Sequence, residues 1–187
     1  FQHGVGRYVS WEFKAEESSV KGTIHGSDKL QGHSLMELEG FDFTAQVTYR
    51  LLPESLEIIF DVSGDQPVET GIHYYYDIKN QETAKVFLPI EGKPDDFSMP
   101  VKGNLTGRFI PRKDLGDELT YTLDTDTYRL GTTVKVIGDP EETFDTITVF
   151  SPENETFVCV EPISSLSRQS NVKTVNTGSI LLTPTLK

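Results

Sequence analysis

Strand-forming segments recur at short intervals along the whole chain, and this pattern constrains the fold more than any other feature. Residues 46–52 and 56–62 are rich in strand formers and flank the turn formers Pro53-Glu54-Ser55, which predicts a β-hairpin. The other predicted strands are 84–88, 118–123, 128–136, 146–150, 156–160 and 179–183. A spacing of about ten residues, with Gly, Pro, Asn or Asp between strands, is typical of an antiparallel β-sandwich or barrel.

Helical signals are weak in this sequence. No long segment keeps apolar residues at helical spacing, and residues 34–39 form only a short helix candidate. A chain of 187 residues suits one domain and is long enough to bury a sizeable core. We therefore predict an all-β fold, an antiparallel β-sandwich, as a single domain over residues 1–187.

The composition argues against several classes of partner. The net charge is -12 and the isoelectric point is about 4.7, which disfavours nucleic acid and anionic membrane surfaces. A single cysteine, Cys159, excludes an internal disulfide, and its apolar surroundings predict a buried spectator thiol. No apolar run approaches the length of a membrane span, and no signal peptide opens the sequence. We expect a cytoplasmic protein, whose oligomeric state the sequence leaves open.

The aromatic segment 71–76 holds the first candidate for chemistry. On a strand, His73 and Tyr75 share one face, and Tyr74 and Tyr76 share the other. Gly71 permits close backbone approach just before the histidine. A histidine in such a position can serve as an acid or base, although spacing alone favours a core residue with a satisfied hydrogen bond.

Glu161 is the second candidate. It continues the face of Phe157 and Cys159, and the following Pro162 predicts that the strand ends there. A partly desolvated carboxyl group at that place would have a raised pKa and would act as a better base. The competing interpretation is an ordinary solvated strand end.

The N-terminal segment offers a possible binding loop. Gly4 and Gly6 make the loop pliant, and Arg7 presents a planar fork suited to hydroxyl, carboxylate or phosphate oxygens. His3 lies beside it, and Trp11 follows as either a stacking surface or a core residue. A surface loop beside a core tryptophan is the alternative.

A fourth candidate is the acidic pair Asp124 and Asp126, which points to one face of a strand and could bind sugar hydroxyls or a cation. A polar edge or turn is the favoured interpretation of this pair. His25 and His33 lie apart in a Gly-rich segment without metal-ligand spacing, so no metal site is expected. The sequence contains no phosphate-cradling loop and no nucleophile elbow, and no cofactor is expected.

Four segments in order resemble the aldose 1-epimerase (galactose mutarotase) family. They are Gln2-His3-Gly4-Val5-Gly6-Arg7 with Trp11, the hairpin over 49–62, Gly71-Ile72-His73-Tyr74-Tyr75, and Phe157-Val158-Cys159-Val160-Glu161-Pro162. The first is similar to the family's His-Gly-Phe-x-Arg segment, and the last to its Cys-Ile-Glu-Pro strand. Val5 and Tyr74 stand where the family has phenylalanine and proline.

The resemblance implies an enzyme that opens and recloses a hexose ring. Glu161 would be the general base and His73 the general acid, while His3 and Arg7 would bind the sugar. The family's substrate-binding aspartate falls in the region of residues 124–126, without a clean match. No cofactor or metal takes part.

Two features of the resemblance leave alternatives. Family members are longer and have strands before the His-Gly segment, so we expect this chain to be a C-terminal portion of a longer protein. The form of residues 3–7 is also similar to the hexose-6-phosphate 1-epimerase subgroup, with Arg7, Arg108 and Arg112 as candidate phosphate ligands. A carbohydrate-binding module without turnover is a further alternative, and the preferred sugar stays open.

Overall fold

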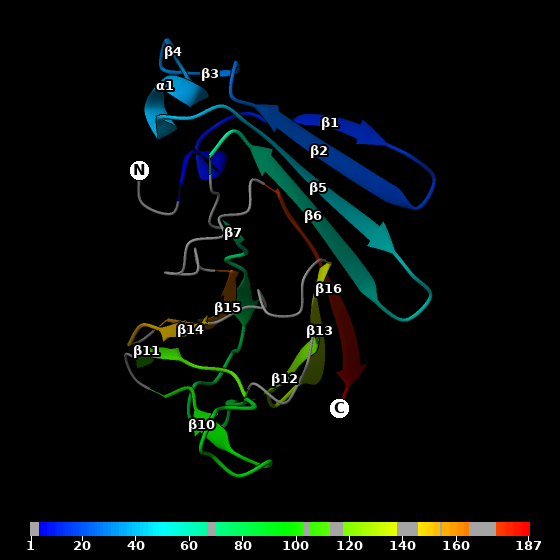
Figure 1. Cartoon of the computed structure of the whole chain (residues 1–187). Coiled ribbons are helices and arrows are strands. Elements are labelled where there is room, and N and C mark those ends of the chain that lie inside the picture. Colours follow the sequence, from blue (N-terminus) through cyan, green and yellow to red (C-terminus); the bar gives the residue numbers. More distant parts are fainter. Residues whose placement is uncertain are drawn as a thin grey trace.

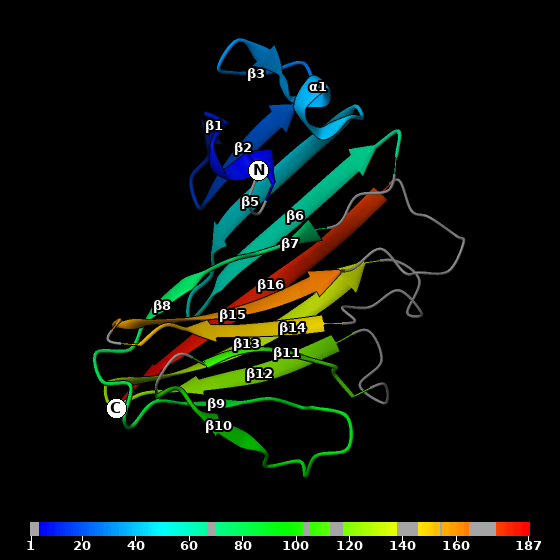
Figure 2. The same ribbon diagram turned by 90° about the vertical axis from the view of Figure 1, so that its left-hand side faces the viewer.

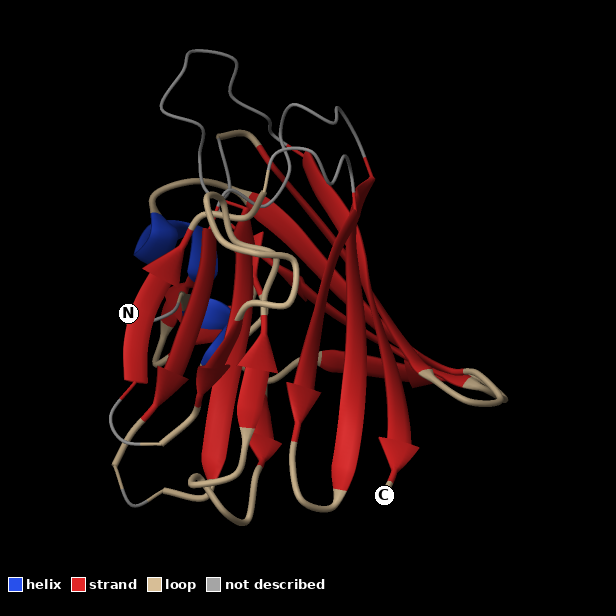
Figure 3. Ribbon diagram, turned by 90° about the horizontal axis from the view of Figure 1, so that it is seen from below, coloured by secondary structure: helices blue, strands red, loops and turns tan. Residues whose placement is uncertain are grey.

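The computed structural model describes residues 4–66, 70–102, 105–112, 118–137, 146–153, 155–164 and 175–187. Two antiparallel β-sheets dominate this part of the chain, and they face one another across a shared core (Figures 1 and 2). Seen from below, strands make up nearly all of the regular structure, and the helical turns lie at one side (Figure 3). The predicted antiparallel β-sandwich is confirmed.

The larger sheet has nine strands and joins the two ends of the chain. In spatial order they are β1 (Glu12–Ala15), β2 (Ser19–His25), β5 (Phe43–Leu51), β6 (Leu56–Gly64), β16 (Val175–Leu186), β13 (Tyr128–Ile137), β12 (Glu118–Asp124), β9 (Lys85–Phe87) and β10 (Ser98–Pro100). The C-terminal strand β16 lies between β6 and β13 and pairs with both along most of its length. This central strand therefore connects the N-terminal hairpins with the later ones.

The smaller sheet has five strands. It contains β11 (Leu105–Phe109), β14 (Thr146–Ser151) and β15 (Phe157–Ser164), with the short strands β7 (Thr70–Gly71) and β8 (Tyr75–Asp77) both paired to β15. Strand β14 alternates partly exposed and buried residues, as expected for a sheet with one face on the core. A separate hairpin is formed by β3 (Lys29–Leu30) and β4 (His33–Ser34).

The main core fills the space between the two sheets. Its fully buried members include Ile58 and Ile180 from the large sheet and Val149 and Val158 from the small one. Two tyrosine pairs also cross this core. The buried Tyr76 and Tyr121 hydroxyls lie 3.2 Å apart, and the Tyr74 hydroxyl donates to the Tyr49 hydroxyl at 3.5 Å. These polar contacts fix how β8 and the segment before it sit against the large sheet.

The short helix predicted at residues 34–39 is present as α1 (Leu35–Glu39). Ser34 accepts a hydrogen bond from the Glu37 backbone, and the Glu37 side chain accepts one from the Ser34 backbone, which completes a capping box. Gly40 closes the helix in the left-handed region. None of the helices in the described ranges has the length and apolar character that crossing a membrane requires.

One strand boundary differs from the prediction in a way that matters for the site. We expected the strand to end at Glu161 because Pro162 follows, but β15 continues to Ser164. Pro162 lies opposite residue 72, between β7 and β8, where the ladder is interrupted. A proline, which has no N–H to donate, is tolerated at such a break. Glu161 therefore lies inside a strand and not in a loop.

Candidate active site

His73 and Glu161 are brought opposite one another by the pairing of β15. This strand pairs with β7 at Gly71 and with β8 at Tyr75, and both contacts belong to the same antiparallel register. His73 lies midway between these two positions, outside both strands, and the register places it across from Glu161. Because side chains directly opposite in an antiparallel pair lie on one face, the imidazole and the carboxyl group meet.

The two functional groups lie within hydrogen-bonding distance. The Nε2 atom of His73 is 3.1 Å from the Oε1 atom of Glu161. Glu161 is 7 % exposed, and this burial raises its pKa to about 7, while the Arg108 guanidinium partly offsets the effect. Near neutral pH the carboxyl group is therefore divided between its acid and base forms, which suits a group that both accepts and returns a proton.

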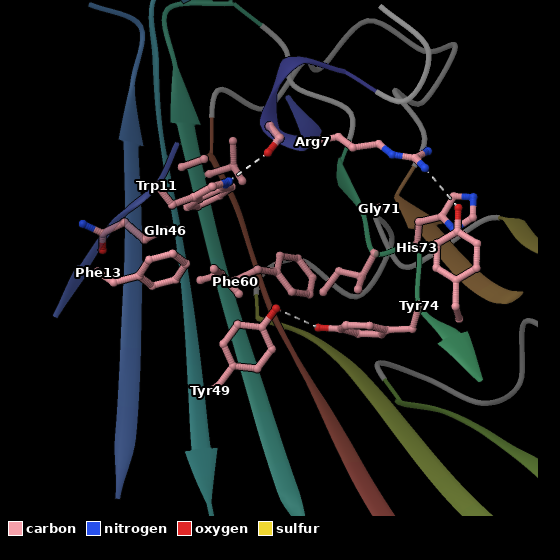
Figure 4. A pocket seen from close by; sticks show the side chains of 15 residues that line it. Arg7, Trp11, Phe13, Gln46, Tyr49, Phe60, Gly71, His73 and Tyr74 are labelled. Atoms are coloured by element: carbon pink, nitrogen blue, oxygen red, sulfur yellow. Dashed lines mark hydrogen bonds between the residues drawn. The ribbon is translucent and has the colours of Figure 1, made fainter. Parts of the chain in front are cut away.

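Tyr75 and Arg7 lie next to this pair. The Tyr75 ring stacks on the His73 ring, with centroids 4.9 Å apart and planes inclined by 26°. The Nη2 atom of Arg7 donates a hydrogen bond to the Tyr75 hydroxyl, with 3.3 Å between the two atoms (Figure 4). The guanidinium therefore lies beside the tyrosine that stacks on the imidazole, and it is exposed and able to meet a ligand.

The turn that carries Arg7 is the 3-10 helix η1 (Val5–Arg7), which is anchored on both sides. Gly4 precedes it with φ 74°, a left-handed backbone angle that favours glycine. The Val5 amide donates to the Glu39 carboxylate at 3.0 Å, and the Trp11 indole donates to the Gly6 carbonyl at 2.8 Å. These contacts hold the N-terminal turn against α1 and the large sheet, so the arginine is presented from a fixed base.

Cys159 is buried and free, as the sequence predicted, and it lies beside the pair. Ligand atoms of His73, Cys159 and Glu161 all lie within 4.8 Å of one another, so these residues are also a group that could hold a metal ion. Burial raises the pKa of the Cys159 thiol to about 12, and Glu161 adds to this shift. The thiol is therefore fully protonated at neutral pH. Cys159 and Glu161 were expected on one strand face, but their spacing did not link them to His73, and no metal site was expected here.

A cavity of about 480 Å³ borders the site and lies in the size range of small-molecule pockets. His73, Tyr75 and Arg7 contribute to one side of it. Figure 4 shows the other side, where aromatic rings of the large sheet face the segment that carries His73. The rings that line the cavity come from Trp11, Phe13, Tyr49, Phe60 and Tyr74. Trp11 is therefore both part of the N-terminal packing and part of the cavity wall.

The structure does not bring the predicted acidic pair to this place. The carboxylate of Asp124 forms an ion pair with Lys187 at 2.5 Å, at the end of β12. Asp126 accepts a hydrogen bond from the Asn80 side chain at 3.4 Å on an exposed surface. Both aspartates thus have partners in the large sheet and its loops, in line with the polar-edge interpretation. His3 lies outside the described residues.

Two further residues lie in line with Glu161, an arrangement that the sequence did not predict. Thr148 of β14 is the cross-strand partner of Glu161, and Arg108 of β11 is the cross-strand partner of Thr148. The three residues form one row across the small sheet. Strand β11 was not predicted, so the row could not be assembled from the sequence, although Thr148 and Glu161 both fell within or beside predicted strands.

Comparisons with solved structures place the fold. A galactose mutarotase related enzyme from Lactobacillus acidophilus is 16 % identical, with a TM-score of 0.66 over 96 % of this chain and 73 % of its own. A galactose mutarotase-like protein from Clostridium acetobutylicum is 11 % identical, with a TM-score of 0.65 over 99 % and 68 % of the two chains. The Slr1438 protein from Synechocystis is 16 % identical, with a TM-score of 0.71 over 99 % of this chain and 69 % of its own.

These similarities define the class of fold: the chain has the galactose mutarotase-like β-sandwich, as the resemblance in its sequence implied. The likeness is structural and the identities are low. Searches by sequence find no matching family model and no matching curated protein. What this particular protein does must therefore be argued from its own site.

Proposed function

We propose that the protein interconverts the α and β anomers of a hexose by acid–base opening and reclosure of the sugar ring. The observation that carries this proposal is the contact of 3.1 Å between His73 and the buried Glu161. Galactose mutarotase-like neighbours support the same class of reaction. An exposed tyrosine and an arginine beside the pair suit a hydroxyl-rich ligand.

Ring opening requires two proton transfers at atoms that share one carbon. Glu161, in its ionised form, removes the proton from the C1 hydroxyl, and protonated His73 delivers a proton to the ring oxygen. The C1–O5 bond breaks, C1 becomes an aldehyde carbon, and rotation about C1–C2 exposes its other face. Reclosure reverses both transfers. Since the C1 hydroxyl and the ring oxygen are both bonded to C1, the acid and the base must lie side by side, as these two groups do.

The energetic demand on such a site is modest. Ring opening occurs slowly in water, and one positioned acid or base typically contributes about 10²- to 10⁴-fold to the rate. The two groups also support each other's reactive forms, because the carboxylate favours the imidazolium and the imidazolium favours the carboxylate. The reaction requires no covalent intermediate.

Polarimetry of freshly dissolved α-galactose and α-glucose tests this proposal. The wild-type protein should speed the relaxation of optical rotation, and Glu161→Gln and His73→Asn should each reduce the enzymatic rate by about 10²-fold or more. Pre-incubation with a chelator should leave the rate unchanged. A folded Glu161→Gln variant with wild-type activity would rule out the assigned base, and loss of activity with chelator would point instead to a metal at the His73 cluster.

A hexose 6-phosphate is the second candidate substrate, because two arginines act on the site of a protein with net charge -12. Arg108 lowers the pKa of Glu161, and Arg7 lowers that of Cys159, which places both positive charges near the pair. The third candidate, Arg112, instead pairs with Asp95. Arg108→Gln should selectively slow turnover of glucose 6-phosphate relative to glucose. Equal effects on both sugars would remove the phosphate assignment.

A further inference from the structure

Strand β14 carries the hydroxyl group of Thr148 next to the site, and the proposed reaction assigns no role to it. Thr148 lies directly opposite Glu161 in the register of β14 and β15, so the two side chains project from the same face. Side chains in such cross-strand pairs have Cβ atoms about 5 Å apart, within reach of a hydrogen bond after a rotamer change. On the opposite side of Thr148 lies Arg108.

The Thr148 hydroxyl lacks a hydrogen-bond partner within the described ranges, although its oxygen is buried. A buried hydroxyl without a partner is costly, and a hydrogen bond to a nearby acceptor would remove that cost. Glu161 offers the acceptor. Its Oε1 atom lies 3.1 Å from the Nε2 atom of His73, and a carboxylate has a second oxygen that can accept a further hydrogen bond.

We propose that Thr148 is a positioning residue for Glu161: its hydroxyl donates to the carboxylate when the base is ionised and holds the carboxylate toward His73. This inference rests on the proposed function for its catalytic meaning, but the interaction itself does not. A donor to the ionised form lowers the pKa of a carboxyl group. Thr148 would thus act together with Arg108 against the burial that raises the pKa of Glu161.

Other groups that face Glu161 must be held constant in the test. They are His73 from the segment before β8, Arg108 from β11, and Cys159 from β15 itself; Arg7 and Tyr75 lie one contact further out. None is changed by substitutions at position 148. Thr148→Val replaces the hydroxyl by a methyl group and keeps a β-branched strand residue, whereas Thr148→Ser keeps the hydroxyl.

The decisive experiment is a carbon-13 NMR titration of the Glu161 carboxyl group in full-length protein labelled at glutamate, with the signal assigned through Glu161→Gln. Thr148→Val should raise the pKa of Glu161 by about one unit, and Thr148→Ser should leave it near the wild-type value. Thr148→Ala gives a second hydroxyl-free variant if the valine protein folds poorly. Thr106→Val is the control: it deletes an exposed hydroxyl on β11 that is not paired with β14 at Thr148, and it should leave the pKa of Glu161 unchanged.

The activity readout separates this inference from the proposed function. In an active enzyme, Thr148→Val should move the acidic limb of the pH profile of kcat to higher pH by the same amount as the pKa of Glu161. Thr148→Ser should keep this limb at its wild-type position. An unmoved titration would overturn the inference, as would a change confined to KM, which would make Thr148 a substrate ligand. If the wild-type protein accelerates no mutarotation, the proposed function fails, while the titration still decides whether Thr148 bonds Glu161.

Discussion

Glu161 couples the stability of the fold to pH in a direction opposite to that of most carboxyl groups. Burial raises its pKa from 4.5 to about 7, so the folded state holds this proton more tightly than the unfolded state does. Below about pH 4.5 the carboxyl group is protonated in both states, and the stabilising contribution is complete. As the pH rises toward about 7, the unfolded state releases the proton first, and the contribution is lost.

We therefore predict that Glu161→Gln changes the pH dependence of unfolding. Relative to the variant, the free energy of unfolding of the wild type should fall by up to about 3 kcal/mol between about pH 4.5 and pH 7, and stay level above. Urea unfolding at a series of pH values measures this difference. Glu155→Gln, an exposed glutamate, serves as the control and should give a curve parallel to the wild type. If the free energy of unfolding of Glu161→Gln followed the same pH dependence as the wild type, burial would not raise the pKa of Glu161 in the folded state.

At the level of single residues, it was the resemblance to a family that paired His73 with Glu161, and the structure places the two side chains in contact. His73 and Glu161 belong to segments far apart in the chain. Spacing alone favoured an ordinary structural role for His73 and left the role of Glu161 open. Their contact depends on the common register of two very short strands with β15, which no local pattern reveals. The acidic pair illustrates the reverse case: two aspartates with suitable spacing have Lys187 and Asn80 as partners instead.

At the scale of elements, the central strand β16 depends on a glycine where it crosses Phe60. A Cβ atom on Gly178 would lie 2.5 Å from the Phe60 Cζ atom and 2.7 Å from the Lys135 carbonyl oxygen. The second of these is backbone in the neighbouring strand and cannot move aside without distorting the sheet. The chain therefore needs a residue without a side chain at the point where β16 joins the N-terminal and C-terminal halves of the large sheet.

Gly178→Ala should destabilise the protein by about 1–3 kcal/mol, the usual cost of inserting atoms into a packed core. Urea denaturation gives the value. The matched control is Gly131→Ala on β13, where an added Cβ atom would meet only the Thr183 carbonyl oxygen at 3.8 Å. A Gly178→Ala protein as stable as Gly131→Ala would contradict the packing described for β16.

Most strands that alternate clearly over many residues could be predicted, although the seven-residue β2 was missed, and most short strands other than β9 could not. Strands β5, β6, β12 and β13 were expected close to their observed bounds because their apolar faces recur with period two. Strands of two or three residues, such as β7 and β8, carry too little pattern, and they gain their pairing from β15. Pro162 misled the prediction, because its tolerance depends on a gap in the neighbouring ladder.

At the scale of the whole molecule, the site exists because two sheets and the N-terminal turn meet. The small sheet supplies the row from Arg108 to Glu161, and η1 brings Arg7 from the far end of the sequence to the Tyr75 hydroxyl. The buried contact between Tyr76 and Tyr121 ties the small sheet to the large one close to this place. The fold class followed from strand periodicity, whereas this three-way meeting needed coordinates.

The most direct test of the account is NMR exchange spectroscopy on galactose at anomeric equilibrium, with and without the protein. Exchange between the two anomeric protons should become detectable with wild-type protein and vanish with an equal amount of Glu161→Gln that still binds the sugar. Sugar binding by the wild type, seen as line broadening, without any exchange between anomers would contradict the central claim and leave a carbohydrate-binding module in its place.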